Sequence, residues 1–288
     1  MKLLILAANG QIARIVEERI LTEDKFKDVD LVLLLRRASR LQSLKDRYPD
    51  RVTLVDGDIN NKQVVVDAVK GCDMIFSAVV DHDDAGNNRP TKNIIAAAEA
   101  NKISRVIETS LLGIYDEVPG KFGKWNRDFC FGGNPEGSSP VNADQLLEDS
   151  GLDYTTLCLP WLNDRPEFKY SITHRHDTYV GVSGSRQSMA DVVLKIVADP
   201  TFGSRDSLGI ADPDTDGLTR PVYFKKNRPA QPAQCLNLLT LSVLDHHFLF
   251  GLLHPIPNYF FFYFPNNIFR NVSDGNAIDL IQTGIVDT

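Results

Sequence analysis

The regular alternation of short apolar runs and helix-like segments constrains the fold of this chain more than any other sequence feature. The expected strands are short, and the first of them is continuously apolar, which is typical of a strand buried on both faces of a sheet. They alternate with segments whose apolar residues recur at helical spacing. This order predicts an α/β fold of the Rossmann type, a doubly wound parallel sheet with helices on both faces. The expected strands span 2–8, 30–37, 51–59, 72–80, 104–115 and 152–162, and the expected helices span 11–21, 62–71, 91–102, 140–150 and 185–200.

Composition excludes several classes of protein. The 288 residues carry a formal net charge of -7, which argues against nucleic-acid binding as the main activity. The opening apolar run is short and is interrupted by Asn9-Gly10, so it reads as a first strand and not as a signal peptide. No metal site, membrane or nucleic-acid partner is expected. The four cysteines lie far apart and predict reduced thiols in a cytoplasmic protein; they are Cys72, Cys130, Cys158 and Cys235.

The composition changes near residue 225. Only seven charged residues occur among the last 63 positions, and residues 248–269 form an aromatic run interrupted by three prolines. Such a run fits neither a transmembrane helix nor a regular helix or strand. We therefore expect a Rossmann domain with its substrate pocket over residues 1–225, and an irregular aromatic-rich extension over residues 226–288.

The turn after the first strand is a candidate for the pyrophosphate of a dinucleotide. Dinucleotide-binding turns have three glycine positions. The first allows a tight turn, the second lets the backbone approach the pyrophosphate, and the third lets the helix pack closely on the strand. Here these positions are Ala7, Gly10 and Ala13. Ala7 departs from the pattern: its methyl group is tolerated in extended backbone but would push the phosphate away if φ is positive. The alternative is an α/β domain that has such a turn and binds no nucleotide.

Two arginines end the second expected strand. NAD-binding proteins usually place an acidic residue there for the ribose hydroxyls, whereas arginine suits the 2′-phosphate of NADP. Arg36 and Arg37 occupy this place and Arg40 follows one turn later. The pattern favours NADP as cofactor, with NAD as the alternative. A basic strand end exposed to solvent would look the same.

Several segments together resemble atypical short-chain dehydrogenase/reductases of the NAD(P)H-binding, NmrA-like family. They are LLILAANGQIARIV (3–16), DGD (56–58), TSLLGIYDEVPGKFGKWN (109–126), SGLDYT (150–155) and SRQSMADVVLKIVADP (185–200). The resemblance covers residues 1–224. It implies a cofactor site at Asn9, Gly10, Gln11, Ile12, Arg36, Arg37, Asp58, Ile59, Ser77, Ala78, Val79 and Ser110. It also makes Tyr115, Trp125 and Trp161 candidates for the wall of a substrate pocket, with core packing as the alternative.

The chain departs from the wider superfamily at the residues that supply the proton. Standard members use a serine together with a tyrosine and a lysine spaced YxxxK. The serine position reads Leu111, and the segment 138–147 (SSPVNADQLL) contains neither tyrosine nor lysine. The usual LRPAWL reads LCLPWL, with Cys158 in place of arginine and Leu159 in place of proline. No catalytic residue can be named from the sequence.

Three functions remain open at this point. The first is an NADPH-preferring oxidoreductase that acts on an unknown small molecule without the YxxxK acid. The second is a non-catalytic NADP(H)-sensing regulator of the NmrA-like type, which signals to a protein partner. The third is a degenerate member of the family that binds nothing.

Overall fold

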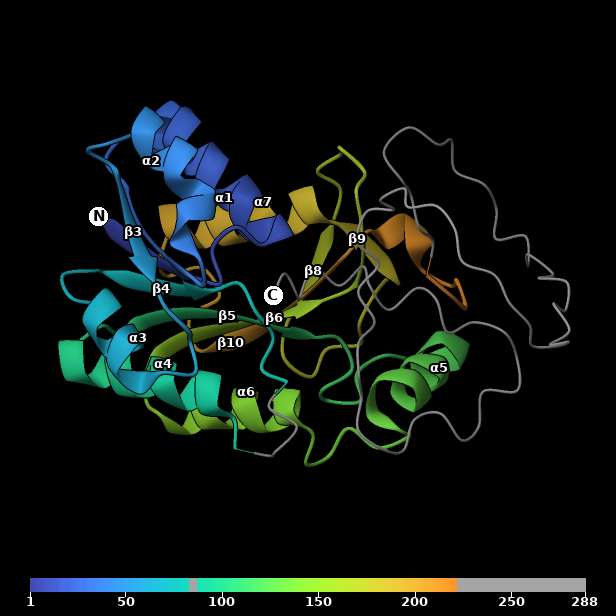
Figure 1. The fold of residues 1–288 in the computed structure, drawn as a ribbon. Coiled ribbons are helices and arrows are strands. Elements are labelled where there is room, and N and C mark those ends of the chain that lie inside the picture. Colours follow the sequence, from blue (N-terminus) through green and yellow to red (C-terminus); the bar gives the residue numbers. More distant parts are fainter. Residues whose placement is uncertain (83–86, 222–288) are drawn as a thin grey trace, which may run out of the picture. The chain divides into compact units, whose positions relative to one another are not determined.

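The computed structural model describes residues 1–82 and 87–221, which form one compact unit around a large sheet (Figure 1). The expected boundary at residue 225, the extension over 226–288 and Cys235 lie outside the described residues. Among the described residues, no helix is both long and apolar enough to cross a membrane.

The main sheet has eight strands in the order β3-β2-β1-β4-β5-β6-β10-β8. Every pairing in it is parallel except that of β10 with β8. Its strands are β1 (Lys2–Leu6), β2 (Asp30–Leu35), β3 (Val52–Asp56), β4 (Met74–Ser77), β5 (Arg105–Leu111), β6 (Asp153–Leu159), β8 (Ser171–Thr173) and β10 (Asp206–Ala211). A second sheet pairs β7 (Trp161–Asn163) with β9 (Ser183–Ser185).

Helices cover both faces of the main sheet (Figure 1). The helices α1 (Gln11–Thr22) and α7 (Arg186–Ala198) pack on one face, and α3 (Lys62–Ala68), α4 (Arg89–Asn101) and α6 (Ser139–Asp149) pack on the other. The remaining helices are α2 (Gln42–Arg47), α5 (Gly120–Phe131) and the 3-10 turns η1 (Asp24–Phe26), η2 (Ala38–Leu41) and η3 (Pro213–Thr215). The prediction of a doubly wound Rossmann-type sheet is confirmed.

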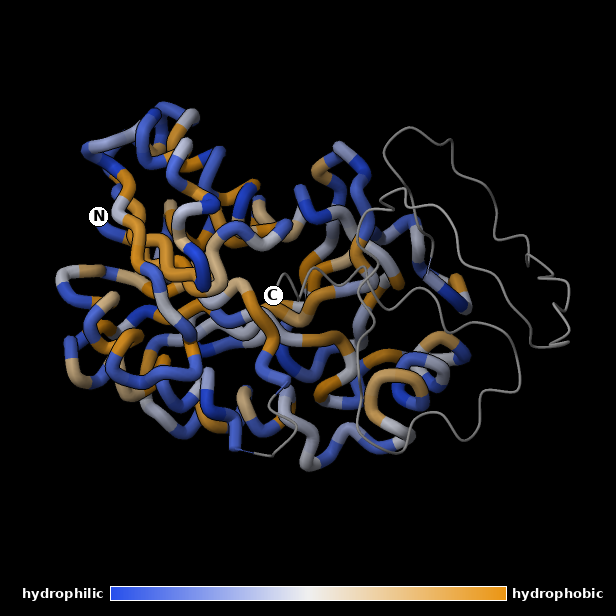
Figure 2. The backbone as a smooth tube through the Cα atoms, viewed as in Figure 1, coloured by the Kyte–Doolittle hydropathy of each residue, from blue (hydrophilic) through white to orange (hydrophobic). Residues whose placement is uncertain are grey.

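Successive side chains along each strand point to opposite faces of the sheet. In β1, Leu3 and Ile5 belong to the core under α1 and α7, while Leu4 and Leu6 belong to the core under α3 and α4. Because both faces are covered, β1, β2 and β4 are almost wholly apolar, and the strands near the N-terminus are mostly orange in Figure 2.

The order of the strands reverses beside β1. The chain runs from β1 outward to β2 and β3, then returns to β4 on the other side of β1. In open α/β sheets, ligands bind outside the carboxyl ends of the strands at such a reversal. The fold therefore places a candidate site between the ends of β1 and β4.

Candidate cofactor and substrate site

All of the predicted cofactor residues lie at the carboxyl ends of five neighbouring parallel strands. The turn at 7–10 follows β1, Arg36 and Arg37 follow β2, and Asp58 and Ile59 follow β3. Ser77 ends β4, and Ser110 is the penultimate residue of β5. Residues far apart in the sequence are thus brought to one edge of the sheet, because parallel strands end on the same side.

The turn after β1 has two residues with left-handed backbone. Ala7 has φ 56° and Asn9 has φ 74°. The φ of Ala7 is therefore positive, which is the case in which its methyl group is predicted to push the phosphate away. A non-glycine residue in this conformation costs about 1 kcal/mol.

The start of α1 nevertheless fits a phosphate. Gly10 is the N-cap with extended backbone, and no side chain caps the helix. The first N–H groups of an α-helix lack partners within the helix and carry partial positive charge, which makes them a binding site for anions. Asn9 to Ile12 would hold the pyrophosphate of a dinucleotide here.

A buried carboxyl group lies against this turn. Glu17 of α1 is 1% exposed, and its Oε1 accepts the backbone N–H of Asn9 at 3.1 Å. Burial raises the pKa of Glu17 to about 7, against the opposing effects of the Asn9 hydrogen bond and the charge of Arg14. This residue was not predicted from the sequence as part of the site, because it falls on the buried face of an otherwise amphipathic helix.

The arginines at the end of β2 are exposed beside an anchored turn. The backbone N–H groups of Arg37 and Ala38 donate to the two carboxylate oxygens of Asp56 at 3.2 and 3.1 Å. Arg37 itself has φ 58°. Asp56 thus fixes the backbone from which Arg36 and Arg37 extend, and their guanidinium groups would meet a 2′-phosphate.

Asp58 and Ile59 form the next wall. The Asp58 carboxylate accepts from the backbone and side chain of Asn60 at 2.8 and 3.0 Å, which forms a compact turn. Ile59 packs on the core, and its carbonyl accepts from the side chain of Asn93 at 2.8 Å. Both residues are only partly buried, as adenine contacts require.

The ends of β4 and β5 carry small and polar groups. The Ser77 hydroxyl donates to the Val79 carbonyl at 3.3 Å, and Ala78 and Val79 are partly exposed. Ser110 is 4% exposed, and its hydroxyl has no hydrogen-bond partner among the described residues. An unpaired buried hydroxyl at this edge is available to a ligand.

Tyr115 lies in a polar cluster away from the other candidate residues of the pocket wall. Its hydroxyl is 2.5 Å from both Asp144 Oδ2 of α6 and Ser207 Oγ of β10. The guanidinium of Arg175 lies 5.0 Å from the centre of its ring and pairs with Asp144 at 3.2 Å. Burial raises the pKa of the Tyr115 phenol. This hydroxyl is thus already engaged, and its role in substrate binding stays a prediction.

The two tryptophans contact each other. Trp125 of α5 and Trp161 of β7 have ring centres 5.1 Å apart, and Phe129 lies beside both. Trp161 Nε1 donates to Asn126 Oδ1 at 3.0 Å, and its side chain belongs to a buried apolar cluster. These contacts favour core packing for Trp161, and a role for either ring in substrate binding stays a prediction.

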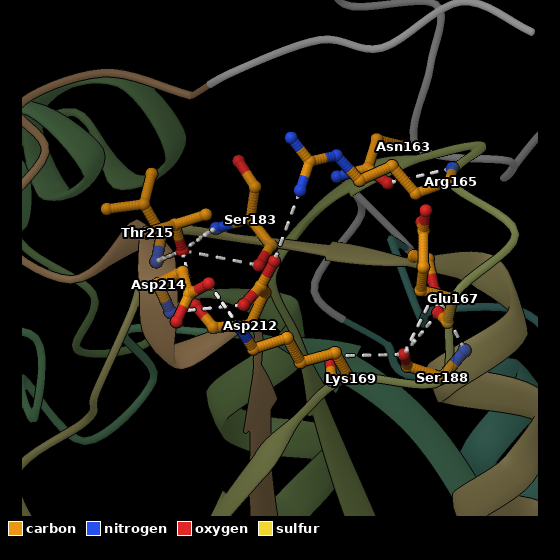
Figure 3. A network of polar contacts seen from close by, with 11 residues as sticks. Asn163, Arg165, Glu167, Lys169, Ser183, Ser188, Asp212, Asp214 and Thr215 are labelled. Carbon is orange, nitrogen blue, oxygen red and sulfur yellow. Dashed lines mark hydrogen bonds and ion pairs between the residues drawn. The ribbon is translucent and has the colours of Figure 1, made fainter. Parts of the chain in front are cut away.

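A polar cavity of about 170 Å³ lies at the carboxyl ends of the neighbouring strands (Figure 3). Asn163 ends β7, Ser185 ends β9 and Asp212 directly follows β10. The cavity is lined by Asn163, Arg165, Glu167, Lys169, Ser185, Asp212 and Asp214. Arg165 lies 3.7 Å from the Asp212 carboxylate, and Lys169 contacts the Asp214 carboxylate.

This cavity was not predicted from the sequence. Its lining comes from the segment after β7 and from the ends of β9 and β10, and of these residues only Ser185 fell within an expected element, the helix 185–200. The available signal was the run of charges at Asp164, Arg165, Glu167 and Lys169 directly after the last expected strand. The predicted pocket residues Tyr115, Trp125 and Trp161 do not line it.

The first turns of α6 carry neither the tyrosine nor the lysine of standard family members. Residues 138–147 supply only Asp144 as a charged group. Asp144 forms an ion pair with Arg175, which lies in the loop after β8. This arginine neutralises the Asp144 carboxylate, whereas the arginine of the family's LRPAWL segment is replaced by Cys158 in this chain. In the part of the chain that the structure describes, no three His, Cys, Asp or Glu side chains are placed to hold a metal ion.

Comparisons with known proteins agree with this geometry. A sequence model of the NAD(P)H-binding family matches residues 7–200. A wide-type short-chain dehydrogenase/reductase from Veillonella parvula, solved in complex with NADP, is 27% identical with a TM-score of 0.66, over 76% of this chain and 98% of that chain. No curated protein matches.

Two further solved structures are similar. A Rossmann-fold NAD(P)-binding protein from Shigella flexneri is 27% identical, with a TM-score of 0.61 over 77% of this chain and 98% of its own. ChuY, an anaerobillin reductase from Escherichia coli O157:H7, is 21% identical with a TM-score of 0.59, over 76% of this chain and 100% of that chain, and shows the shared fold. With its helix N-terminus after β1 and its reversed strand order, the chain belongs to the NAD(P)H-binding family of Rossmann proteins and is an atypical short-chain dehydrogenase/reductase.

Proposed function

We propose that this protein is an NADPH-dependent reductase that acts on a small polar carbonyl compound. The observation that carries the proposal is the convergence of an uncapped helix N-terminus, two arginines and an unpaired Ser110 hydroxyl along the ends of β1, β2 and β5. The NADP bound to the Veillonella relative supports the choice of cofactor.

Each group of site residues binds a different part of the dinucleotide. Asn9 to Ile12 bind the pyrophosphate, Arg36 and Arg37 the 2′-phosphate, and Asp58 and Ile59 the adenine. Ser77, Ala78, Val79 and Ser110 line the ribose and nicotinamide. When bound, NADPH supplies a hydride.

The cavity at the ends of β7, β9 and β10 is the proposed place of the substrate. Its lining contains cationic and anionic side chains that pair with each other, so it favours a polar and not an aliphatic molecule. Its volume of about 170 Å³ suits a small compound.

The experiment is a calorimetric titration of the full chain with NADPH and NADH, followed by a spectrophotometric screen of NADPH oxidation with polar aldehydes, ketones and quinones. The proposal expects tight NADPH binding, weaker NADH binding and oxidation with at least one compound. Equal affinity for both cofactors would contradict the NADPH preference. NADPH binding without oxidation by any compound would contradict the reductase activity.

A second candidate is an NADP(H)-sensing regulator. Leu111 in the serine position and the engagement of the Tyr115 hydroxyl by Asp144 favour it. It expects a protein partner whose binding differs between the oxidised and the reduced cofactor. Partner binding that is insensitive to both forms would exclude it.

A further inference from the structure

Three buried side chains form the floor of the cavity at the ends of β7, β9 and β10 (Figure 3). Asn163 is 3% exposed, Ser185 is 4% exposed and Asp212 is 5% exposed. The rim is formed by the exposed or half-buried residues Arg165, Glu167, Lys169 and Asp214. The cavity therefore has a buried polar floor under a charged rim.

Strand β9 brings Asn163 and Asp212 to this floor. Asn163 is the register partner of Ser185 in the pairing of β7 with β9. On the other side of β9, the backbone N–H of Asp212 donates to the carbonyl of Ser183 at 2.9 Å. The two side chains thus come from the segments on either side of one strand, and backbone hydrogen bonds set their places.

The Asn163 side chain presents hydrogen-bond donors. Its Oδ1 accepts the backbone N–H of Arg165 at 3.1 Å, which identifies the oxygen end of the amide. Its Nδ2 amino group has no hydrogen-bond partner among the described residues. Buried polar groups are normally hydrogen-bonded, so unpaired donors on a residue that is 3% exposed mark a place for an acceptor of a ligand.

The Asp212 carboxylate presents a hydrogen-bond acceptor to the same cavity. Its Oδ1 accepts the backbone N–H of Asp214 at 3.0 Å. Its Oδ2 lies 3.7 Å from Arg165 Nη1, which is close enough for an ion pair but too long for a hydrogen bond. Oδ2 therefore keeps its capacity to accept a hydrogen bond from a ligand.

Arg165 connects the donor with the acceptor. Its backbone N–H binds the Asn163 amide, and its guanidinium lies beside the Asp212 carboxylate (Figure 3). The two groups thus lie at opposite ends of one arginine residue. A ligand that reaches both must carry at least two polar groups on a chain of several atoms.

The hydrogen-bonding capacity of the floor selects the chemistry of this ligand. An ionised carboxylate only accepts hydrogen bonds, and it would bring a second negative charge beside Asp212. An ammonium group only donates, and it leaves the Asn163 amide without an acceptor. A hydroxyl group donates and accepts, so it fits both places. Several hydroxyl groups on one carbon chain therefore match the cavity better than a single ionic group.

We propose that the substrate is a polyhydroxylated carbonyl compound, such as a short aldose or ketose, and that Asn163 and Asp212 select it by binding its hydroxyl groups. This inference rests on the proposed reductase function and names its class of substrate. One hydroxyl accepts from Asn163 Nδ2. A second hydroxyl donates to Asp212 Oδ2 and accepts from the Arg165 guanidinium.

The first test needs neither cofactor nor turnover. Ligand-observed NMR titrations of the full chain use erythritol, its analogue without the two inner hydroxyl groups (butanediol), butanamide and butanoate. Hydrogen bonds to charged groups change affinity by about tenfold to hundredfold, so we expect erythritol to bind at least about tenfold more tightly than the other three. Erythritol that binds no more tightly than butanediol overturns the proposal, and so does tighter binding of butanamide or butanoate.

Two isosteric variants locate the binding. Asn163→Asp keeps an acceptor for the Arg165 N–H and removes the amide donors. Asp212→Asn keeps an acceptor for the Asp214 N–H and removes the charge. Each is expected to weaken erythritol binding at least about tenfold. Unchanged erythritol affinity in both variants overturns the proposal.

Asn134→Asp is the matched control. Asn134 is exposed after α5, and its Oδ1 accepts the backbone N–H of Glu136 at 3.1 Å, the same contact that Asn163 makes with Arg165. Erythritol affinity is expected to stay within about twofold in this variant. A loss equal to that of Asn163→Asp overturns the role of the Asn163 donors. If the buried charge prevents Asn163→Asp from folding, as thermal denaturation would show, Asp212→Asn decides the test.

The second test measures NADPH oxidation with erythrulose and with butanone, which has the same carbon chain without hydroxyl groups. A site built to bind hydroxyl groups rejects an analogue that lacks them. We therefore expect kcat/KM for erythrulose to exceed that for butanone at least about 100-fold, and Asp212→Asn to lose most of this preference. Equal kcat/KM values for the two ketones overturn the proposal.

The outcomes separate this inference from the proposed function. NADPH oxidation with carbonyl compounds, together with erythritol binding no tighter than that of butanediol, overturns the class of substrate and leaves the reductase standing. Erythritol binding that depends on Asn163 and Asp212, in a chain that oxidises NADPH with no compound, overturns the reductase and supports the cavity as a site for hydroxyl groups.

Discussion

The backbone N–H of Gly10 donates to the carbonyl oxygen of Ala7 at 3.2 Å and closes the turn that follows β1. The closure holds Ala7 at φ 56°, a conformation that glycine adopts without strain. One methyl group therefore stands where dinucleotide-binding turns have a hydrogen atom.

Ala7→Gly is expected to stabilise the protein by about 0.5 kcal/mol, because the relief of left-handed strain is partly offset by the greater entropy of glycine in the unfolded chain. It is also expected to tighten NADPH binding. Urea denaturation and calorimetry measure the two effects. Ala8→Gly, at the neighbouring buried position without positive φ, is the control and is expected to destabilise. If Ala7→Gly destabilised the protein, the conclusion that Ala7 is strained at positive φ would be wrong.

Glu17 is expected to make cofactor binding depend on pH. Its pKa is raised by burial to about 7, so the carboxyl group is neutral below this pH and negative above it. A negative charge against the turn repels pyrophosphate. NADPH affinity is therefore expected to fall as pH rises from 6 to 8, and Glu17→Gln is expected to remove this fall. A profile that is unchanged in Glu17→Gln would exclude the residue as its source.

The same group affects stability. The pKa of the Glu17 carboxyl group is 4.5 in the unfolded chain and about 7 in the folded one. Its contribution to the free energy of unfolding is therefore fully present below pH 4.5 and is lost as the pH rises through 7. Each pKa unit corresponds to 1.36 kcal/mol, which gives a loss of up to about 3 kcal/mol. Glu17→Gln is thus expected to be more stable than wild type at pH 8 and not at pH 4, as measured by denaturant titration.

Arg36 and Arg37 are expected to decide between the cofactors. Hydrogen bonds to charged groups contribute about 1.5–3 kcal/mol, so Arg36→Ala with Arg37→Ala is expected to weaken NADPH binding by at least tenfold. NADH affinity changes little, since NADH lacks the 2′-phosphate. Arg47→Ala, an exposed arginine of α2, controls for the general loss of positive charge. An equal loss for both cofactors would show that the pair does not read the 2′-phosphate.

Arg105 is a buried charged residue whose removal is expected to destabilise the fold strongly. Its buried guanidinium donates to the carbonyls of Pro200 and Phe202 at 2.9 and 3.0 Å and to Thr155 Oγ1 at 2.6 Å. Arg105→Ala leaves these acceptors without a donor, and we expect a loss of about 3 kcal/mol in the free energy of unfolding. A loss below about 1 kcal/mol would show that water replaces the side chain.

The sequence predicts the strands β1 to β6 from their apolar runs, and the helices α1, α3, α4 and α6 between them from their helical spacing. It extends the sixth strand to residue 162, whereas Pro160 separates β6 from β7. It misses the short helix α2, the strand β10, whose polar first residues include the Ser207 that binds Asp144, and the helix α5, whose glycines and charges hide its apolar side.

The candidate site divides in the same way. Gly10 and Arg36 follow strands and Ser110 stands near the end of one, so all three are visible from local sequence. The surroundings of Tyr115 are not, because Asp144 comes from α6 and Ser207 from β10, and only the folded sheet brings the three together. The positive φ of Ala7 likewise depends on tertiary structure and has no local signature.

The position of β1 between β2 and β4 also has a consequence for synthesis of the protein. A nascent chain that has emerged only as far as β3 already contains the turn at 7–10, but lacks the strand that forms the other wall of the crevice. Both walls of the crevice are therefore present only after β4 has paired with β1. Since a ligand stabilises only the state that binds it, a dinucleotide held in this crevice would stabilise the chain only from that stage on.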